Sequence, residues 1–155
     1  MSQWGASVDD YRAIENLIYR YAERIDAGDL EGVAELFRHG AITAPAHDSR
    51  VEGYRAVLDM YRASCRIYPE TGTPRTRHIT TNVLVEVAGE EAIARSTFTV
   101  LQATESLPLQ PIITGRYSDR FQRRDGAWVF RERAMHVDFV GDCSAHLLYE
   151  PPRPG

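Results

Sequence analysis

The chain has 155 residues, of which 43% are hydrophobic and 26% charged, as expected for one soluble globular domain covering residues 1–155. Its formal net charge of -4 counts against nucleic acid as the main partner, because phosphate binding needs a clustered positive surface. All 18 basic residues are arginines, so no lysine side chain is present for Schiff-base or general-base chemistry.

Neither a signal-peptide pattern nor an apolar run of membrane-spanning length occurs, so we expect a cytoplasmic protein without membrane contacts. The two cysteines, Cys65 and Cys143, are too few for a disulfide framework and lack the spacing of metal ligands. A phosphate-binding glycine loop, a zinc-binding spacing and a serine-nucleophile elbow are also missing from the sequence. We therefore expect neither a metal nor a cofactor.

The first predicted helix begins at Ser7-Val8-Asp9-Asp10, which has the pattern of a capping box. Apolar residues then recur with helical spacing as far as Ile25, and Gly28 ends the helix. Asp29 is well placed to cap a second, short helix over 30–37. The following segment, 40–52, is expected to be irregular, with one possible short strand over 41–43.

A third helix is predicted over 53–68, and its apolar face carries three tyrosines. The tyrosines are Tyr54, Tyr61 and Tyr68. Because each hydroxyl needs a hydrogen-bond partner, these residues suit either a core or the wall of a pocket. Tyr54 and Tyr61 are therefore candidate pocket residues.

Beyond Pro74 the apolar period changes from helical to alternating, which predicts four long strands over 75–87, 91–104, 112–124 and 127–140. Asp125-Gly126 is a strong hairpin signal between the last two. Helices followed by a meander of strands predict an α+β fold, in which a cone-shaped, curved antiparallel sheet wraps around the first helix.

Several of these strands are apolar on both faces in part, so we expect a homo-oligomer, either a dimer or a trimer. The expected core spans residues 8–140. The tail over 141–155 contains His146 and a proline-rich end; it packs over a pocket mouth, packs on a neighbour, or stays loose.

The strand that begins the sheet carries the most interesting polar face. With strict alternation, His78, Thr80 and Asn82 share one face, and Ile79 and Val83 lie on the other. A histidine beside two small hydrogen-bonding residues suits a pocket wall, although this segment by itself favours a solvent-facing strand with an ordinary histidine.

Asp26 is the second candidate, since it falls on or beside the apolar stripe at the C-terminal end of the first helix. The helix macrodipole disfavours an anion there, so the carboxylate needs a partner unless it turns into water before Gly28. An aspartate beside an imidazole fixes its tautomer and stabilises the imidazolium. Asp26 and His78 would then form a general base without metal or nucleophile.

Four segments carry a resemblance to a known family: 21–29, 77–82, 114–117 and 123–128. Over nearly its whole length the chain resembles the SnoaL-like branch of the nuclear-transport-factor-2-like superfamily. The resemblance implies a cone-shaped α+β barrel that binds a small molecule. Within the superfamily the arrangement is similar to hexachlorocyclohexane dehydrochlorinase and, more distantly, to scytalone dehydratase.

Carried over by motif, the resemblance implies that His78 abstracts a proton, that Asp26 orients the His78 side chain and that Arg133 assists the leaving group. The dehydrochlorinase has a catalytic lysine where this chain has Tyr21, which argues against halide elimination. A tyrosine there favours dehydration, isomerisation or cyclisation of an oxygenated substrate. His136 is a further candidate acid or base, but alternation places it on the face opposite Arg133 unless a bulge intervenes.

Three functions fit these observations. The first is a cofactor-free lyase or isomerase that acts on a small, apolar, cyclic, oxygenated substrate. The second follows from Arg75-Thr76-Arg77-His78 and Asn82, which also resemble the non-catalytic small subunit of aromatic-ring-hydroxylating dioxygenases. The third is a ligand-binding module without catalysis, because a fold alone does not determine function.

Overall fold

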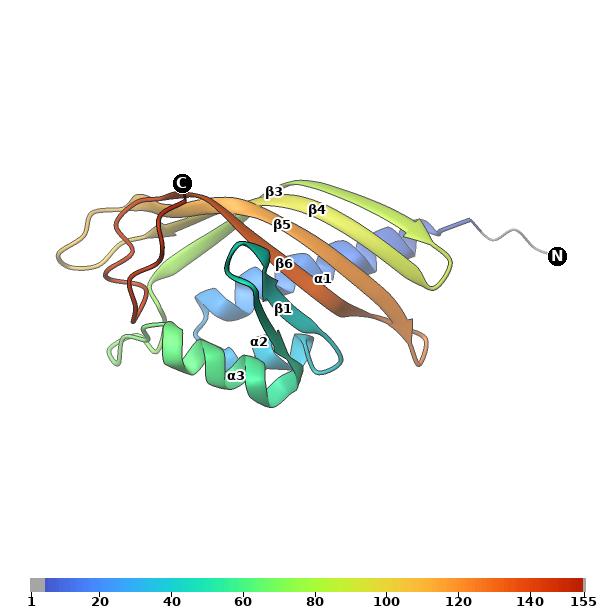
Figure 1. Ribbon diagram of the computed structural model, residues 1–155, viewed down its shortest axis with the longest axis horizontal. Coiled ribbons are helices and arrows are strands. Elements are labelled where there is room, and N and C mark those ends of the chain that lie inside the picture. The colour runs from blue at the N-terminus through green and yellow to red at the C-terminus, as the bar shows by residue number, and fades with distance from the viewer. Residues whose placement is uncertain (1–4, 155) are drawn as a thin grey trace.

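The computed structural model describes residues 5–154, which form three α-helices and one curved, open sheet of six strands in the order β2-β1-β6-β5-β4-β3. The elements are α1 (Val8–Asp26), α2 (Leu30–Leu36), β1 (Ala41–Ala44), the 3-10 helix η1 (Pro45–His47), β2 (Ser49–Glu52), α3 (Gly53–Ser64), β3 (Thr76–Ala88), β4 (Glu91–Gln102), β5 (Gln110–Arg124) and β6 (Ala127–Val140). The long strands form an arched layer with α2 and α3 on its concave side (Figure 1). The predicted α+β fold with a curved sheet is confirmed. Within residues 5–154, no helix has both the length and the apolar character to cross a membrane.

Helix α1 begins with the predicted capping box. The Ser7 side chain accepts a hydrogen bond from the Asp10 backbone N–H, and the Asp10 carboxylate accepts one from the Ser7 backbone N–H. One stripe of the helix, which includes Ile14, Ile18 and Ile25, is buried against the sheet and the other helices.

Two predictions about the middle of the chain were wrong. The segment expected to be irregular contains a second strand, β2, which pairs antiparallel with β1, while β1 pairs parallel with β6. Helix α3 ends at Ser64 rather than near residue 68, because Cys65 adopts an extended backbone and forms a bridge with Leu147. Tyr68 therefore lies outside the helix.

Strand β3 departs from strict alternation at Asn82, whose φ of 54° breaks the ladder between Thr81 and Leu84. This bulge reverses the phase of the strand, so the half-buried Val83 lies on the same side as His78 instead of the opposite side. The apolar second half of β3 can thus pack on the core while its first half presents His78 to the same interior.

The end of the chain closes one end of the molecule. Residues 141–148, which we call the C-terminal strap, leave β6 and cross to the end of α3 (Figure 1). The backbone N–H of Gly141 donates to the Ile112 carbonyl, and that of Leu148 donates to the Ser64 carbonyl. The strap therefore ties the last strand to the last helix, next to the start of β3.

Candidate functional site

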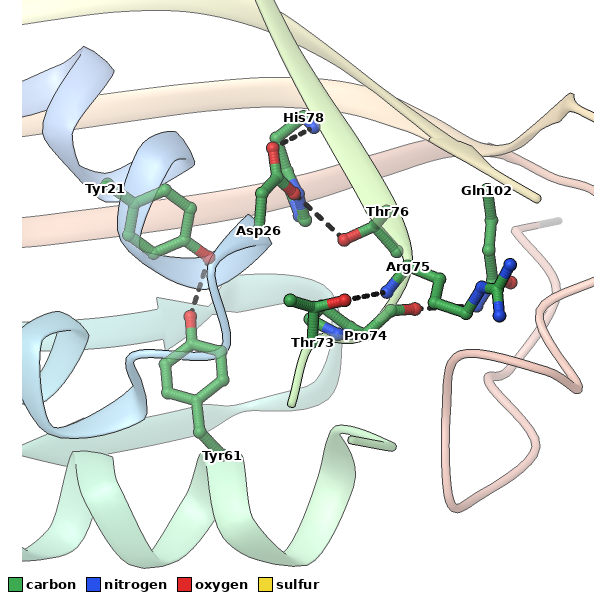
Figure 2. A network of polar contacts seen from close by, with 9 residues as sticks. All are labelled: Tyr21, Asp26, Tyr61, Thr73, Pro74, Arg75, Thr76, His78 and Gln102. Atoms are coloured by element: carbon green, nitrogen blue, oxygen red, sulfur yellow. Dashed lines mark hydrogen bonds and ion pairs between the residues drawn. The ribbon is translucent and has the colours of Figure 1, made fainter. Parts of the chain in front are cut away.

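Asp26 and His78 meet where the end of α1 faces the start of β3 (Figure 2). The Asp26 carboxylate lies 2.6 Å from His78 Nδ1 and also accepts hydrogen bonds from the His78 backbone N–H at 2.7 Å and the Thr76 hydroxyl at 2.9 Å. The side chains of His78 and Asp26 are only 8% and 13% exposed. The two residues singled out from distant parts of the sequence are therefore in direct contact.

These contacts explain how a carboxylate is tolerated at the C-terminal end of a helix. The macrodipole is unfavourable for an anion there, but three donors converge on Asp26, one of them a backbone N–H. Thr76 precedes His78 by two residues, so both side chains point to the same side of β3. The strand therefore supplies all three donors from two residues.

The geometry determines what the imidazole of His78 can do. A proton on Nδ1 is held by the carboxylate, so Nε2 is left as the unprotonated, basic nitrogen of the neutral ring. Within residues 5–154, no group hydrogen-bonds to Nε2. If Nε2 takes up a proton, the adjacent carboxylate stabilises the resulting imidazolium. The arrangement is that of a general base.

The pair borders a groove of about 470 Å³ between α1 and the edge strand β3. The groove is lined by Tyr19, Ala22, Glu23, Asp26, Ala27, Thr76, Arg77, His78 and Thr80. It combines apolar helix surface with a few polar groups, which is the usual character of a small-molecule site. The acidic Glu23 and the basic Arg77 lie in the same lining.

Tyr21 lies beside His78 but is already engaged elsewhere. Its ring is in edge contact with the imidazole, with ring centres 6.3 Å apart, while its hydroxyl lies 2.7 Å from that of Tyr61 (Figure 2). Burial raises the pKa of both phenols, so both hydroxyls remain protonated. The structure therefore brings Tyr21 and Tyr61 together with His78, although their hydroxyls bond each other.

Arg133 lies deeper in the molecule, fully buried and paired in two parallel hydrogen bonds of 2.9 and 2.8 Å with the equally buried Asp119. Its guanidinium also stacks on aromatic rings, 3.9 Å from the centre of Tyr117 and 4.4 Å from that of Tyr21. One guanidinium nitrogen, Nη1, is buried and has no hydrogen-bond partner in the described part of the chain. The residue expected to assist a leaving group is held in a core ion pair, and no contact joins it to His78.

Three other candidates lie outside this cluster. Tyr54 is at the start of α3, where Arg38 stacks on its ring. Asn82 forms the exposed bulge of β3. His136 pairs across the sheet with the exposed Arg116, so it lies on the outer face, as alternation required. The structure therefore does not support a pocket role for these three residues.

His146 lies beside the Asp26–His78 pair, although the sequence did not single it out. It lies in the C-terminal strap, its side chain is buried, and its ring centre is 6.3 Å from that of His78. The only sequence signal is a histidine among apolar residues in a tail whose packing the sequence left open, and such a signal specifies no partner. Within residues 5–154, no group of three or more His, Cys, Asp or Glu side chains is arranged to hold a metal ion.

The comparison with protein families agrees with the fold. The SnoaL-like domain family matches residues 6–134, which is most of the chain. The chain belongs to the SnoaL-like family. None of the curated proteins compared with the chain matches it.

Solved structures show the same architecture. A variant of Rv3472, a Mycobacterium tuberculosis protein of unknown function, is 28% identical, with 86% of this chain and 79% of that chain covered at a TM-score of 0.71. A Novosphingobium aromaticivorans protein proposed to be a scytalone dehydratase is 24% identical, with 94% of this chain and 91% of that chain covered at a TM-score of 0.70. Another protein from that organism, proposed to be an aromatic ring hydroxylase, is 17% identical, with 91% of this chain and 99% of that chain covered at a TM-score of 0.72. At these identities the last two show a shared fold, not a shared activity.

Proposed function

We propose that this SnoaL-like protein is a cofactor-free lyase or isomerase that acts on a small, apolar, cyclic, oxygenated substrate. The observation that carries the proposal is the largely buried Asp26–His78 contact, with Nδ1 held at 2.6 Å and Nε2 left without a protein partner. A base of this kind removes a proton from carbon when a neighbouring carbonyl stabilises the resulting charge. The solved structure proposed to be a scytalone dehydratase has the same fold, which fits this reaction class.

In the proposed reaction, His78 Nε2 takes a proton from the carbon next to a carbonyl group. The C–H electron pair becomes part of an enolate, and Asp26 stabilises the imidazolium. In a dehydration the enolate expels the β-hydroxyl group, which takes the proton from the imidazolium and leaves as water. In an isomerisation the imidazolium returns the proton to a different carbon. His78 ends neutral in both cases, and no electrons are exchanged with another molecule.

The limited exposure of the pair supports this chemistry. A base that is mostly shielded from water is surrounded by fewer competing hydrogen bonds, so its interaction with the carboxylate is stronger than in bulk solvent. The neighbouring groove is bounded partly by aliphatic and aromatic groups such as Ala22 and Tyr19, which suits an apolar ring. The shielded base and the partly apolar groove together favour an uncharged cyclic ketone as the substrate class.

Proton abstraction can be tested before the substrate is identified. Purified protein is incubated in D2O with cyclohexanone, tetralone and a β-hydroxy derivative of each, and loss of the α-proton signal or formation of the enone is followed by NMR. We expect catalysed exchange or elimination with at least one compound, and a decrease of about 100-fold or more in His78→Ala and Asp26→Asn.

His136→Ala removes a histidine from the outer face and serves as the matched control, which should retain the activity. Thermal unfolding of each variant shows whether it is folded. An equally active His78→Ala protein would rule out the base, and a wild-type protein inactive on the whole panel would favour a non-catalytic module.

A further inference from the structure

The strap holds the segment around His146 through its backbone. The Ala145 carbonyl accepts hydrogen bonds from the Tyr68 hydroxyl at 2.6 Å and from Gln102 Nε2 at 3.0 Å. The carbonyl of His146 itself accepts one from the Arg66 backbone N–H at 2.8 Å. Because these contacts involve only main-chain atoms of the strap, its attachment does not require the imidazole ring.

The ring of His146 lies next to the candidate base. It packs in an edge-to-face arrangement against the His78 ring, and the residue is only 7% exposed. Its Nδ1 atom is buried and has no hydrogen-bond partner among residues 5–154. Buried polar side chains nearly always have a partner, so this nitrogen, next to the candidate general base, has a hydrogen-bonding capacity that the described residues do not use.

The charge state of the ring is also set by its surroundings. Burial, assisted by the nearby His78, lowers the pKa of His146 to about 4, although the Asp26 carboxylate acts in the opposite direction. His146 is therefore neutral near pH 7 and has one nitrogen that donates and one that accepts. A neutral imidazole can polarise a carbonyl oxygen without transferring its proton.

We propose that His146 is a second catalytic residue, which hydrogen-bonds an oxygen atom of the substrate while His78 removes the proton from the adjacent carbon. The inference rests on the proposed function for its chemistry and defines the substrate class further. The substrate must carry a carbonyl or hydroxyl oxygen near the acidic carbon. In this proposal that oxygen lies on the side of His78 that faces His146.

The step is balanced without any further reactant. The C–H bond breaks, its proton goes to His78 Nε2, and its electron pair moves toward the carbonyl carbon as the oxygen becomes an enolate. The N–H group of neutral His146 donates to that oxygen and keeps its proton. The hydrogen bond strengthens as negative charge develops, so it stabilises the transition state more than the ground state.

Phenol is a suitable probe, because it is an apolar ring whose hydroxyl resembles an enol and can donate to or accept from either nitrogen of His146. Binding is followed by the imidazole nitrogen signals in NMR spectra of 15N-histidine-labelled protein. We expect phenol to shift the His146 signals. His146→Phe, which keeps a ring but removes the nitrogens, should weaken binding about tenfold, the loss of one good hydrogen bond.

His146→Asn places an amide near the position of Nδ1 and should restore most of the affinity. His136→Phe, the same substitution on the outer face, should change nothing. Equal affinity in wild-type and His146→Phe protein would overturn the inference. So would a failure of phenol to bind the wild-type protein or to move the His146 signals.

The exchange assay separates this inference from the proposed function. We expect His146→Phe to lower exchange about tenfold or more, through kcat rather than through unfolding. If His78→Ala abolishes exchange while His146→Phe leaves exchange and phenol binding intact, only the role of His146 fails. If the wild-type protein catalyses no exchange, the proposed function fails, and phenol binding still decides whether His146 is an oxygen-binding group.

Discussion

Asp26 shows how strongly one side chain can depend on distant partners. Its carboxylate would be unfavourable at the end of α1 by itself, yet it receives donors from both Thr76 and His78. The same bonds hold the imidazole in one orientation. The position of the carboxylate and the tautomer of the imidazole are therefore determined together by one group of hydrogen bonds between α1 and β3.

The Tyr21–Tyr61 hydroxyl pair is expected to contribute to stability. Tyr21→Phe leaves the buried Tyr61 hydroxyl without its partner, so we predict a loss of about 1–3 kcal/mol in the free energy of unfolding. The Tyr21→Phe/Tyr61→Phe double variant removes both hydroxyls and should be no less stable than either single variant. Urea denaturation of the four proteins measures this coupling. Losses that add in the double variant would show that the two hydroxyls do not depend on each other.

The buried Arg133–Asp119 pair gives a second prediction. Asp119→Asn leaves the guanidinium uncompensated in a site without solvent access, so we expect a loss of about 3–5 kcal/mol. Asp119→Leu combined with Arg133→Met replaces the pair by apolar groups and should recover at least half of that loss, as measured by urea denaturation. Recovery would assign a structural role to Arg133. A double variant as unstable as the sum of its parts would contradict it.

At the level of residues, the sequence could single out Asp26 and His78 as candidate site residues because each stands out in its local pattern. One is an acid on an apolar stripe at a helix end, and the other is a histidine on a polar strand face. Arg133 has no such anomaly that reveals its partner, because Asp119 lies on a neighbouring strand and their register depends on bulges in β6. His146 depends on the path of the strap, which no local periodicity encodes.

Among the elements, the strands followed from alternation and hairpin signals, whereas the irregularities within them did not. Bulges shift the register of β3 against β4 and of β5 against β6. Each bulge moves every later side chain to the other face, and this is how His78 and the valines of β3 share one side. The short β2 strand was missed for a related reason, since Ser49–Glu52 is mostly exposed and has no apolar alternation.

The bulge at Asn82 can be tested directly. Its φ of 54° is tolerated by asparagine and glycine but is strained for a β-branched residue, so Asn82→Val should lose about 1–2 kcal/mol of stability. Asn82→Gly should stay within about 0.5 kcal/mol of wild type. Thr81→Val places the same side chain at the preceding exposed position and should have little effect. Equal effects of the two valines in thermal or urea unfolding would argue against a conformational origin.

For the whole molecule, two long-range ties link the first helix to the sheet, one at each end of α1. At its C-terminal end, Asp26 contacts β3. At its N-terminal end, the Asp10 carboxylate accepts hydrogen bonds from Trp128 Nε1 at 3.0 Å and from Arg123 at 2.6 Å on the last hairpin. Asp10 had been identified only as part of the capping box. Its role in joining α1 to β5 and β6 requires the fold to be known.

This second tie predicts a specific acid sensitivity. The hydrogen bond from Trp128, followed by those from the Ser7 backbone and Arg123, lowers the pKa of Asp10 below its ordinary value of 3.8. A carboxyl group whose pKa is lower in the folded state stabilises the protein at pH values above its unfolded-state pKa. This contribution is lost as the pH falls from roughly 4 through the folded-state pKa.

Trp128 reports on the contact between Asp10 and the last hairpin, and Trp4→Phe makes it the only tryptophan. In that background we expect urea stability to fall from roughly pH 5 to roughly pH 2.5. Asp10→Asn should be less stable near neutrality and show a shallower fall, whereas Asp9→Asn, in the same helical turn, should behave as the parent. An unchanged acid profile in Asp10→Asn would show that this carboxylate does not link α1 to the sheet energetically.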